Sequence, residues 1–318
     1  MRIAIFGAGG IGGFLAAALA RSGADLAVVA RGEHAEAIAR SGLSVRSDLG
    51  AFNVALRVVA RVEELESVDC AVLCVKAHQV PALCDQLAWL ERGGASVVTM
   101  HNGLPFWFTR TPHLESVDPG GRIGAVVPDS AAIGGVVHVS GELLTPGTVL
   151  QSGGTRYVLA PLESQGAAAE RCRQLVTVME RAGLSPELVP DVRPILWAKL
   201  ANNVGLNAVS ALTRLSIQPM LSYAPSRALV RALIEETLAV GRALGVVGEI
   251  DVDARMKYAA RLSDVRTSML QDVRAGKTLE IEPILGATSE LARRMDTPTP
   301  TLDILLSLLR ALERGLRA

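Results

Sequence analysis

The sequence begins with an apolar segment that runs directly into three regularly spaced glycines. Ile3, Ile5 and Phe6 make residues 3–6 a candidate buried strand, and Gly7-x-Gly9-x-x-Gly12 follows at once. The apolar residues 14–20 then predict a helix. Strand, glycine turn and helix in this order form the context in which such a glycine pattern binds a dinucleotide. The first residues therefore predict the opening βα unit of a nucleotide-binding sheet.

Each of the three glycines has its own physical role in such a unit. Gly7 allows a tight turn, Gly9 lets the backbone approach a pyrophosphate, and Gly12 lets the helix pack closely on the strand. The helix N-terminus offers unpaired N–H groups and the positive end of its dipole to the phosphates. The glycines alone do not say which dinucleotide binds, because glycines also serve ordinary turns.

The end of the second predicted strand favours NADP(H). Residues 24–31 are an apolar strand candidate that ends at Arg31. NAD-preferring sites usually carry Asp or Glu at this place, where the carboxylate binds the ribose hydroxyls. A guanidinium instead suits a 2′-phosphate, because its planar donors bind two oxygens at once. The alternative is an arginine that is simply exposed to solvent.

Polar residues also follow two later strand candidates, residues 69–75 and 95–100. Lys76 and Gln79 come directly after the first, and Asn102 after the second. Open α/β sheets bind ligands at the carboxyl ends of their strands. Lys76 and Gln79 are therefore predicted to contact the cofactor, with a solvated loop as the alternative. Asn102 is predicted to lie near the nicotinamide or a substrate oxygen.

The chain changes character from about residue 191, which places a domain boundary near residues 184–192. Up to that point it carries further strand candidates and the amphipathic helix 167–182, and beyond it strand signals disappear. The strand candidates are residues 122–127, 135–140 and 147–151, which suggest antiparallel additions to the sheet. Pro186 and Pro190 punctuate the change. A chain of 318 residues suits two domains, and we predict residues 1–186 as one and 187–318 as the other.

The first helix of the second half carries a polar stripe on an apolar background. Within residues 195–209, Lys199, Asn203 and Asn207 recur every four residues, so they share one helix face. A buried lysine is costly unless it is paired or faces a polar cavity. The stripe therefore predicts a cavity lined with donors and acceptors. The alternative, a lysine that extends to solvent, leaves the two asparagines unexplained.

Two segments near the C-terminus complete the list of candidates. A helical pattern is expected over residues 262–274, which include Ser268. Glu280 follows, and Pro283 fits the opening turn of another helix. Judged by itself, Glu280 is expected to be an exposed carboxylate near a helix start, where the helix dipole favours it.

The charge balance argues for a small-molecule partner. Lys plus Arg and Asp plus Glu number 32 each, so no global charge attracts nucleic acid or an anionic membrane. Arg293-Arg294 is expected to be a solvated pair. No apolar run is long enough to span a bilayer, which makes a cytoplasmic protein the default. The four cysteines lack metal-ligand spacing and are expected to be core residues, and no metal site is predicted.

These residues, in this order, resemble the 2-dehydropantoate 2-reductase (ketopantoate reductase) family over essentially the whole chain. The resemblance implies an α/β Rossmann-type N-terminal domain and an all-α C-terminal domain like that of 6-phosphogluconate dehydrogenase. The matching pieces are Gly7-Ala8-Gly9-Gly10-Ile11-Gly12, Val75-Lys76-Ala77, His101-Asn102-Gly103, Leu196-Trp197-Ala198-Lys199-Leu200-Ala201-Asn202-Asn203, and Ser268-Met269-Leu270-Gln271-Asp272 with Glu280 beyond them.

The resemblance implies reduction of ketopantoate to pantoate by NADPH, a step of pantothenate biosynthesis. Lys199 would then protonate the ketone oxygen as hydride arrives, and Glu280 would hold the substrate hydroxyl and the site geometry. The substrate's polar groups would be bound by Asn203, Asn207 and Ser268. The residues that would bind the cofactor are Gly7, Gly9, Gly10, Ile11, Gly12, Arg31, Lys76 and Gln79, together with Asn102 and Glu280, which also face the substrate. The active site is expected in the cleft between the domains, and an apolar helical domain is compatible with a homodimer.

Two departures from the family pattern keep other readings open. Glu280-Ile281-Glu282-Pro283 stands where well-studied members have Glu-Ile-Asp without proline, and the aromatic segment 104–108 looks like a subgroup feature. Another branched 2-keto acid is therefore an alternative substrate. A 3-hydroxyacid dehydrogenase would be expected to show a His–Glu pair, and none is evident in the sequence. A non-catalytic NADP(H) sensor would have no need for Lys199.

Overall fold

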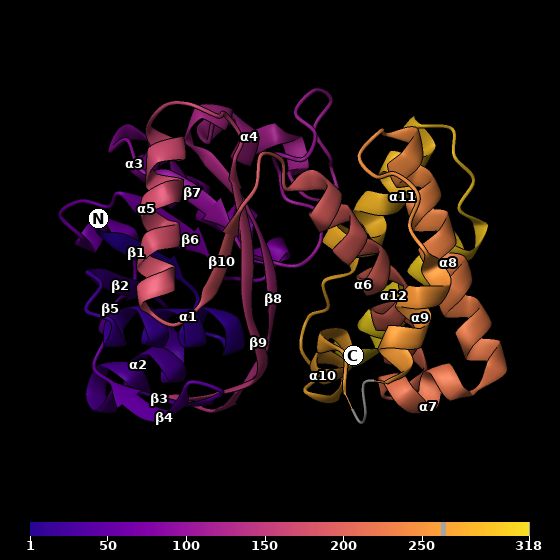
Figure 1. Ribbon diagram of the computed structural model, residues 1–318, viewed down its shortest axis with the longest axis horizontal. Coiled ribbons are helices and arrows are strands. Elements are labelled where there is room, and N and C mark those ends of the chain that lie inside the picture. The colour runs from indigo at the N-terminus through magenta and orange to yellow at the C-terminus, as the bar shows by residue number, and fades with distance from the viewer. Residues whose placement is uncertain (262–264, 318) are drawn as a thin grey trace. The chain divides into compact units, whose positions relative to one another are not determined.

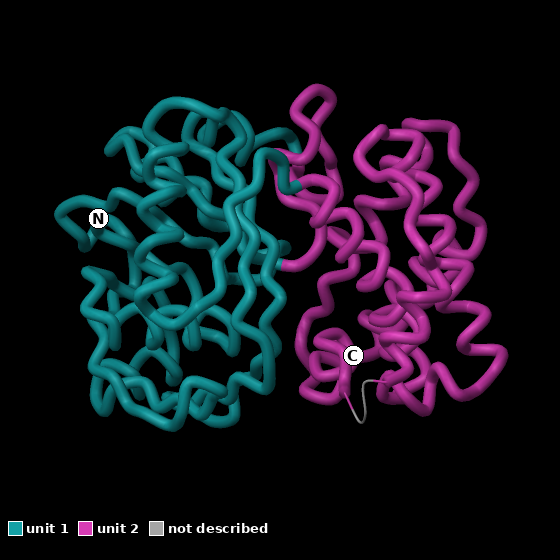
Figure 2. Tube along the Cα trace, viewed as in Figure 1, with its two compact units in different colours: residues 1–101, 120–192 teal, residues 102–119, 193–318 magenta. Residues whose placement is uncertain are grey.

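The computed structural model describes residues 1–261 and 265–317, which form two compact units. Unit 1 comprises Met1–His101 and Gly120–Val192, and unit 2 comprises Asn102–Pro119 and Arg193–Ala318 (Figure 2). Each unit is thus built from two stretches of chain, because the loop that follows residue 101 belongs with the helices. The division into domains after residue 186 stays a prediction.

Unit 1 is a sheet covered by helices, as the sequence predicts (Figure 1). Its described residues form ten strands in the order β4-β3-β9-β8-β7-β6-β1-β2-β5, with β10 paired to β9. The strands are β1 (Ile3–Phe6), β2 (Leu26–Val29), β3 (Leu43–Ser47), β4 (Gly50–Val54), β5 (Arg57–Val59), β6 (Cys70–Leu73), β7 (Ser96–Thr99), β8 (Ala132–Thr145), β9 (Thr148–Pro161) and β10 (Ser185–Leu188). The helices are α1 (Gly10–Arg21), α2 (Gly32–Ser41), α3 (Cys84–Arg92), α4 (Arg122–Val126) and α5 (Ala167–Arg181).

The parallel part of this sheet runs from β5 through β2, β1, β6 and β7 to β8. All residues of β1, β6 and β7 are buried, as expected for strands that are covered on both faces. The chain builds outward from β1 to β2 and then returns to place β6 on the other side of β1. Such a reversal of strand order is where open α/β sheets bind ligands.

Antiparallel strands extend the sheet, which confirms the expected additions. β8 pairs with β9 over most of their length, and β3 pairs with β4 as a hairpin. The prediction of a strand at residues 122–127 was wrong, because Arg122–Val126 forms the short helix α4. Gly121 precedes it in the left-handed conformation, with φ +66°, and so turns the chain into the helix.

Unit 2 is helical, and strand signals disappear as predicted. Its helices are α6 (Arg193–Thr213), α7 (Ile217–Ser222), α8 (Ala224–Ala243), α9 (Val252–Ala260), α10 (Ser268–Arg274), the π-helical turn η5 (Glu282–Gly286), α11 (Ala287–Arg294) and α12 (Pro300–Arg317). The helix expected over residues 262–274 begins only at Ser268, and the preceding Thr267 is its N-cap. Residues 262–264 of that prediction lie outside the described residues. No helix in the described ranges is long and apolar enough to cross a membrane.

Glycines allow α6 and α8 to approach each other closely. A Cβ on Gly205 of α6 would lie 2.8 Å from Ile234 Cγ1, and one on Gly241 of α8 would overlap the indole ring of Trp197. Trp197 is fully buried, and its Nε1–H donates a hydrogen bond to the Thr237 carbonyl at 3.0 Å. The indole is therefore held in place between the two helices.

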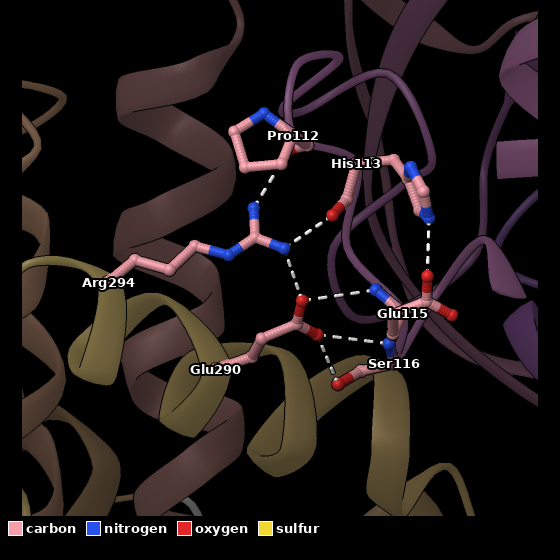
Figure 3. A network of polar contacts seen from close by, with 6 residues as sticks. All are labelled: Pro112, His113, Glu115, Ser116, Glu290 and Arg294. Atoms are coloured by element: carbon pink, nitrogen blue, oxygen red, sulfur yellow. Dashed lines mark hydrogen bonds and ion pairs between the residues drawn. The ribbon is translucent and has the colours of Figure 1, made fainter. Parts of the chain in front are cut away.

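A polar network fastens residues 102–119 to α11 (Figure 3). The Glu290 carboxylate accepts hydrogen bonds from the backbone N–H groups of Glu115 and Ser116, at 3.1 and 3.0 Å, and from the Ser116 hydroxyl. Arg294 pairs with Glu290 and donates to the Pro112 and His113 carbonyls. Burial alone would raise the pKa of Glu290, but these donors outweigh it and lower the pKa.

This network corrects one expectation from the sequence. Arg294 is exposed as a residue, but it is more than a solvated cation, because its side chain, 26% exposed, also holds a distant loop. The aromatic residues of the same loop, Phe106, Trp107 and Phe108, are buried. The Phe108 ring stacks on Trp197, with 5.4 Å between ring centroids. This segment therefore packs as part of unit 2.

We expect Gly241→Ala to lower the free energy of unfolding by about 1–3 kcal/mol, because the added methyl group must displace the packed Trp197 ring. Helix propensity acts in the opposite direction, since alanine is favoured over glycine by about 1 kcal/mol. Denaturant unfolding followed by tryptophan fluorescence measures the balance.

Gly315→Ala is the matched control. Gly315 also lies in a helix, but nothing stands within 4 Å of its added methyl group. This change should leave the stability of the protein equal or slightly higher. A Gly241→Ala protein as stable as the Gly315→Ala protein would contradict the close packing.

Candidate functional site

The glycine turn of unit 1 is closed toward the sheet and open at one glycine. Gly7 follows β1 with φ +91°, a backbone conformation that favours glycine. A Cβ on Gly12 would overlap the Gly7 carbonyl oxygen, so only glycine fits there. Gly9, the N-cap of α1, has open space around its Cβ position. The turn is thus closed toward the sheet and open at Gly9, where a phosphate could approach.

Two further residues of the motif are fixed by packing. A Cβ on Gly10 would overlap the backbone of Gly141 in β8, so this glycine lets α1 begin against the sheet. Ile11 is partly buried and packs against the hydrophobic core of unit 1. Both residues have clear structural reasons for their identity, and their contact with a cofactor stays a prediction.

The other cofactor candidates stand where the sequence predicts them. Arg31 is exposed at the N-cap of α2, just after β2 ends. Lys76 follows β6 and is half-buried. The Gln79 side chain accepts a hydrogen bond from the Lys76 backbone N–H at 3.1 Å, so its amide oxygen already stabilises this turn. β1, β2 and β6 are adjacent in the sheet, which brings their carboxyl ends to one edge.

His34 supports the glycine turn, and sequence reasoning missed it. Its Nδ1 accepts a hydrogen bond from the Gly147 backbone N–H at 2.9 Å, and its Nε2 lies 2.7 Å from the Ala8 carbonyl oxygen. Since Nδ1 accepts, the proton belongs on Nε2, which donates to Ala8. The side chain therefore links α2 to the glycine turn and to the turn between β8 and β9. A histidine in a polar helix carries no signal of this role.

In unit 2, the structure brings Lys199 and Asn102 together. The Lys199 Nζ donates a hydrogen bond to Asn102 Oδ1 at 3.0 Å, across 97 positions of sequence. Lys199 lies in the middle of α6, and Asn102 opens the loop that the Glu290 network holds. Lys199 therefore does not simply extend to solvent, since it is half-buried and hydrogen-bonded to Asn102.

The electrostatics of Lys199 follow from its surroundings. Burial disfavours the cation and lowers the pKa of Lys199 to about 8, and the negative charge of Glu280 opposes this by raising it. Below about pH 8 the side chain is therefore mainly an ammonium, although it loses its proton far more readily than an exposed lysine. Such a group can donate a proton and stabilise a developing oxyanion.

Glu280 corrects the expectation of an exposed carboxylate. Its side chain is buried, with 7% of the residue exposed, and it precedes the π-helical turn that contains Pro283. A buried carboxylate is costly unless a charge or hydrogen bonds compensate. The mutual attraction with Lys199 supplies part of that compensation.

The remaining substrate candidates differ in exposure. Asn207 is buried, at 5% exposure, and Asn203 is half-buried one turn before it on α6. Ser268 is exposed at the first position of α10, and α10 packs against α6. The structure thus gathers Lys199, Asn102 and Glu280 and sets the asparagines along the same face of the helix. The expected cleft between domains stays a prediction.

One His–Glu pair is present, contrary to the absence inferred from the sequence. His113 Nε2 lies 2.5 Å from Glu115 Oε1. The glutamate side chain is 64% exposed, and the pair lies beside the Glu290 network (Figure 3). It therefore lacks the enclosed setting of Lys199.

Family models match almost the whole chain. Residues 3–164 match "Ketopantoate reductase PanE/ApbA", and residues 191–313 match "Ketopantoate reductase PanE/ApbA C terminal". A 2-dehydropantoate 2-reductase from Mesorhizobium japonicum is 41% identical over 325 residues, with 99% of each chain covered.

Solved structures share the fold. A PanE/ApbA family ketopantoate reductase from Ralstonia eutropha JMP134 superposes with a TM-score of 0.85 at 27% identity, and 100% of each chain is covered. A D-mandelate dehydrogenase in a ternary structure with NADH and anilino(oxo)acetate gives a TM-score of 0.87 at 22% identity, again over 100% of each chain. The second likeness bears on the fold alone.

We expect Glu280→Gln to lower the pKa of Lys199 below about 8, because the substitution removes a negative charge that raises it. Heteronuclear NMR of protein labelled with ¹³C at the lysine Cε reports this pKa directly, with Lys199→Arg to assign the signal. Glu282→Gln is the matched control, since the Glu282 side chain is 44% exposed and pairs with Arg310. An unchanged Lys199 pKa in Glu280→Gln would refute the coupling of the two charges.

Proposed function

We propose that this chain, which belongs to the ketopantoate reductase family, reduces 2-dehydropantoate to pantoate with NADPH. As a member of that family it is an oxidoreductase. The observation that carries the proposal is the Lys199 ammonium, hydrogen-bonded to Asn102 and coupled to the buried Glu280 within unit 2.

Lys199 is proposed as the general acid. NADPH, when bound, supplies a hydride for the ketone carbon. Lys199 Nζ donates its proton to the ketone oxygen, and its positive charge stabilises the negative charge that develops there. A pKa of about 8 suits this task, because the group is protonated at neutral pH yet releases the proton readily.

The groups around Lys199 are proposed to position it and the substrate. Asn102 orients the ammonium through its side-chain oxygen. Glu280 keeps the ammonium charged and would accept a hydrogen bond from the substrate hydroxyl. Asn203 and Asn207 supply amide donors and acceptors for the other polar groups of the substrate, and Ser268 would contact the carboxylate.

Unit 1 is proposed to hold the cofactor. The family supports a nicotinamide cofactor, and the open backbone at Gly9 with the α1 N-terminus suits its pyrophosphate. The choice of NADPH rests on Arg31, an exposed guanidinium at the end of β2. Lys76 and Gln79 follow β6, which lies on the other side of β1 from β2, and they are proposed to contact the same ligand.

A different branched 2-keto acid is the second candidate substrate. The two departures from the family pattern touch each other, because the Leu104 backbone N–H donates to the Pro283 carbonyl oxygen at 2.8 Å. Leu104 lies two residues from Asn102, and Pro283 three residues from Glu280. Both departures therefore adjoin residues that are proposed to bind substrate. A homodimer and a cytoplasmic location stay predictions.

We expect Lys199→Ala to lower kcat for 2-dehydropantoate by about 10²–10⁴-fold, the usual contribution of a positioned general acid. NADPH oxidation followed at its absorbance band, over a panel of 2-keto acids, gives kcat and the preferred substrate together. Titration of NADPH fluorescence should show unchanged cofactor binding.

The matched control for this change is Lys277→Ala, because Lys277 is an exposed lysine of unit 2. Its kcat should equal that of the parent protein. Full activity in Lys199→Ala would disprove the proposed acid. If a different keto acid gave the highest kcat/KM, the second candidate would replace ketopantoate.

We expect Arg31→Asp to shift the ratio of kcat/KM for NADPH over NADH toward NADH by at least tenfold, because the new carboxylate repels a 2′-phosphate and suits free ribose hydroxyls. Arg40→Asp makes the same charge change at an exposed position of α2 and should leave the ratio near its parent value. Equal ratios in the two variants would show that Arg31 does not select the cofactor.

A further inference from the structure

A cavity of about 440 Å³ lies within unit 2, between α6, α8 and α9. Its size is in the range of pockets that hold small organic ligands, about 300–1,000 Å³. Its walls are formed mainly by apolar side chains, with one guanidinium and one amide among them. The lining residues include Asn202 and Leu206 of α6, Ile234 of α8, and Arg255, Met256 and Ala259 of α9.

The cavity lies beside the polar stripe rather than on it. Asn202 and Leu206 belong to the face of α6 that adjoins Lys199, Asn203 and Asn207. None of the residues assigned above to substrate or cofactor lines it. The cavity is therefore lined by residues other than those proposed to act in the reduction.

Arg255 gives the cavity its charge. Its Nη1 donates to the Ala198 carbonyl oxygen at 3.2 Å and to Asn202 Oδ1 at 3.3 Å, and both acceptors are neutral. Partial burial lowers the pKa of Arg255, but a guanidinium stays charged in proteins.

The acidic residues nearest to Arg255 in sequence are engaged elsewhere. Asp251 caps α9 by accepting from the Ala254 N–H, and Asp253 pairs with Arg231. Among residues 1–261 and 265–317, no carboxylate forms an ion pair with Arg255. A partly desolvated cation that has no ionic partner among the described residues favours a ligand anion.

The rim and walls of the cavity favour a ligand with an apolar part. Tyr258 lines the cavity although 68% of the residue is exposed. Tyr258 therefore places an aromatic ring at the rim of the apolar hollow. One guanidinium matches one carboxylate, because its planar donors bind both oxygens, whereas the walls match a hydrocarbon chain.

We propose that the cavity between α6, α8 and α9 binds a small amphipathic monocarboxylate, with the carboxylate on Arg255 and the hydrocarbon against Leu206, Ile234 and Met256. This site is separate from the substrate site, and its occupation does not require the proposed reduction.

Octanoate is the probe for this proposal, used with the full chain in the presence of saturating NADPH. We expect saturable binding with one site per chain by isothermal titration calorimetry, and at least tenfold weaker binding of 1-octanol. Arg255→Met should weaken octanoate binding at least tenfold. Lys257→Met is the matched control, because Lys257 is an exposed cation of the same helix, and it should bind octanoate like the parent protein.

The place of binding is tested by NMR of protein labelled with ¹³C at its methionine methyl groups, with Met256→Leu to assign the signal. Octanoate should shift the Met256 signal in the parent protein and equally in Lys199→Ala, because Lys199 is not part of this cavity. The proposal is overturned if Met256 does not respond, if Arg255→Met binds octanoate normally, or if 2-dehydropantoate displaces the probe competitively.

Discussion

The close approach of α6 and α8 is the constraint on which the rest of unit 2 depends. Gly205 and Gly241 lack side chains at two points where the helices pack tightly. The Trp197 indole fills the space beside Gly241 and is fixed by its hydrogen bond to Thr237. Because α6 is held in this way, its Lys199 has a defined position and cannot leave its partly buried setting without disturbing the packing. A lysine with a lowered pKa needs such a rigid support.

The second support of Lys199 comes from a loop. Residues 102–119 bring Asn102 to the lysine, and the loop is held at its far end by the Glu290 and Arg294 side chains. Between these ends, Phe108 stacks on Trp197. The same tryptophan therefore orders both the helix that carries the lysine and the loop that carries its amide partner. The apolar packing of Trp197 and the polar contacts of the loop thus support the same lysine. A change in one of them is expected to disturb the other.

Much of this could be predicted from the sequence. Apolar runs broken by glycines gave the parallel strands, and the spacing of Lys199, Asn203 and Asn207 identified a polar stripe. Local pattern could not reveal contacts between residues far apart in sequence. The Lys199–Asn102 bond spans 97 positions, and the burial of Glu280 depends on helices that surround it. Arg294 and His34 resemble ordinary polar surface residues until their partners are known. The helix at Arg122–Val126 was mistaken for a strand because Ile123 and Val126 are β-branched.

The hydrogen bonds of His34 have a consequence for how the nucleotide-binding unit can be dissected. The glycine turn is attached through His34 to Gly147, and Gly10 packs directly on Gly141. Both partners come from the β8–β9 hairpin, more than a hundred residues further along the chain. The first hundred residues are therefore not a self-contained cassette, although they contain the whole glycine motif. A transplant of the motif into another protein would have to carry that distant hairpin with it.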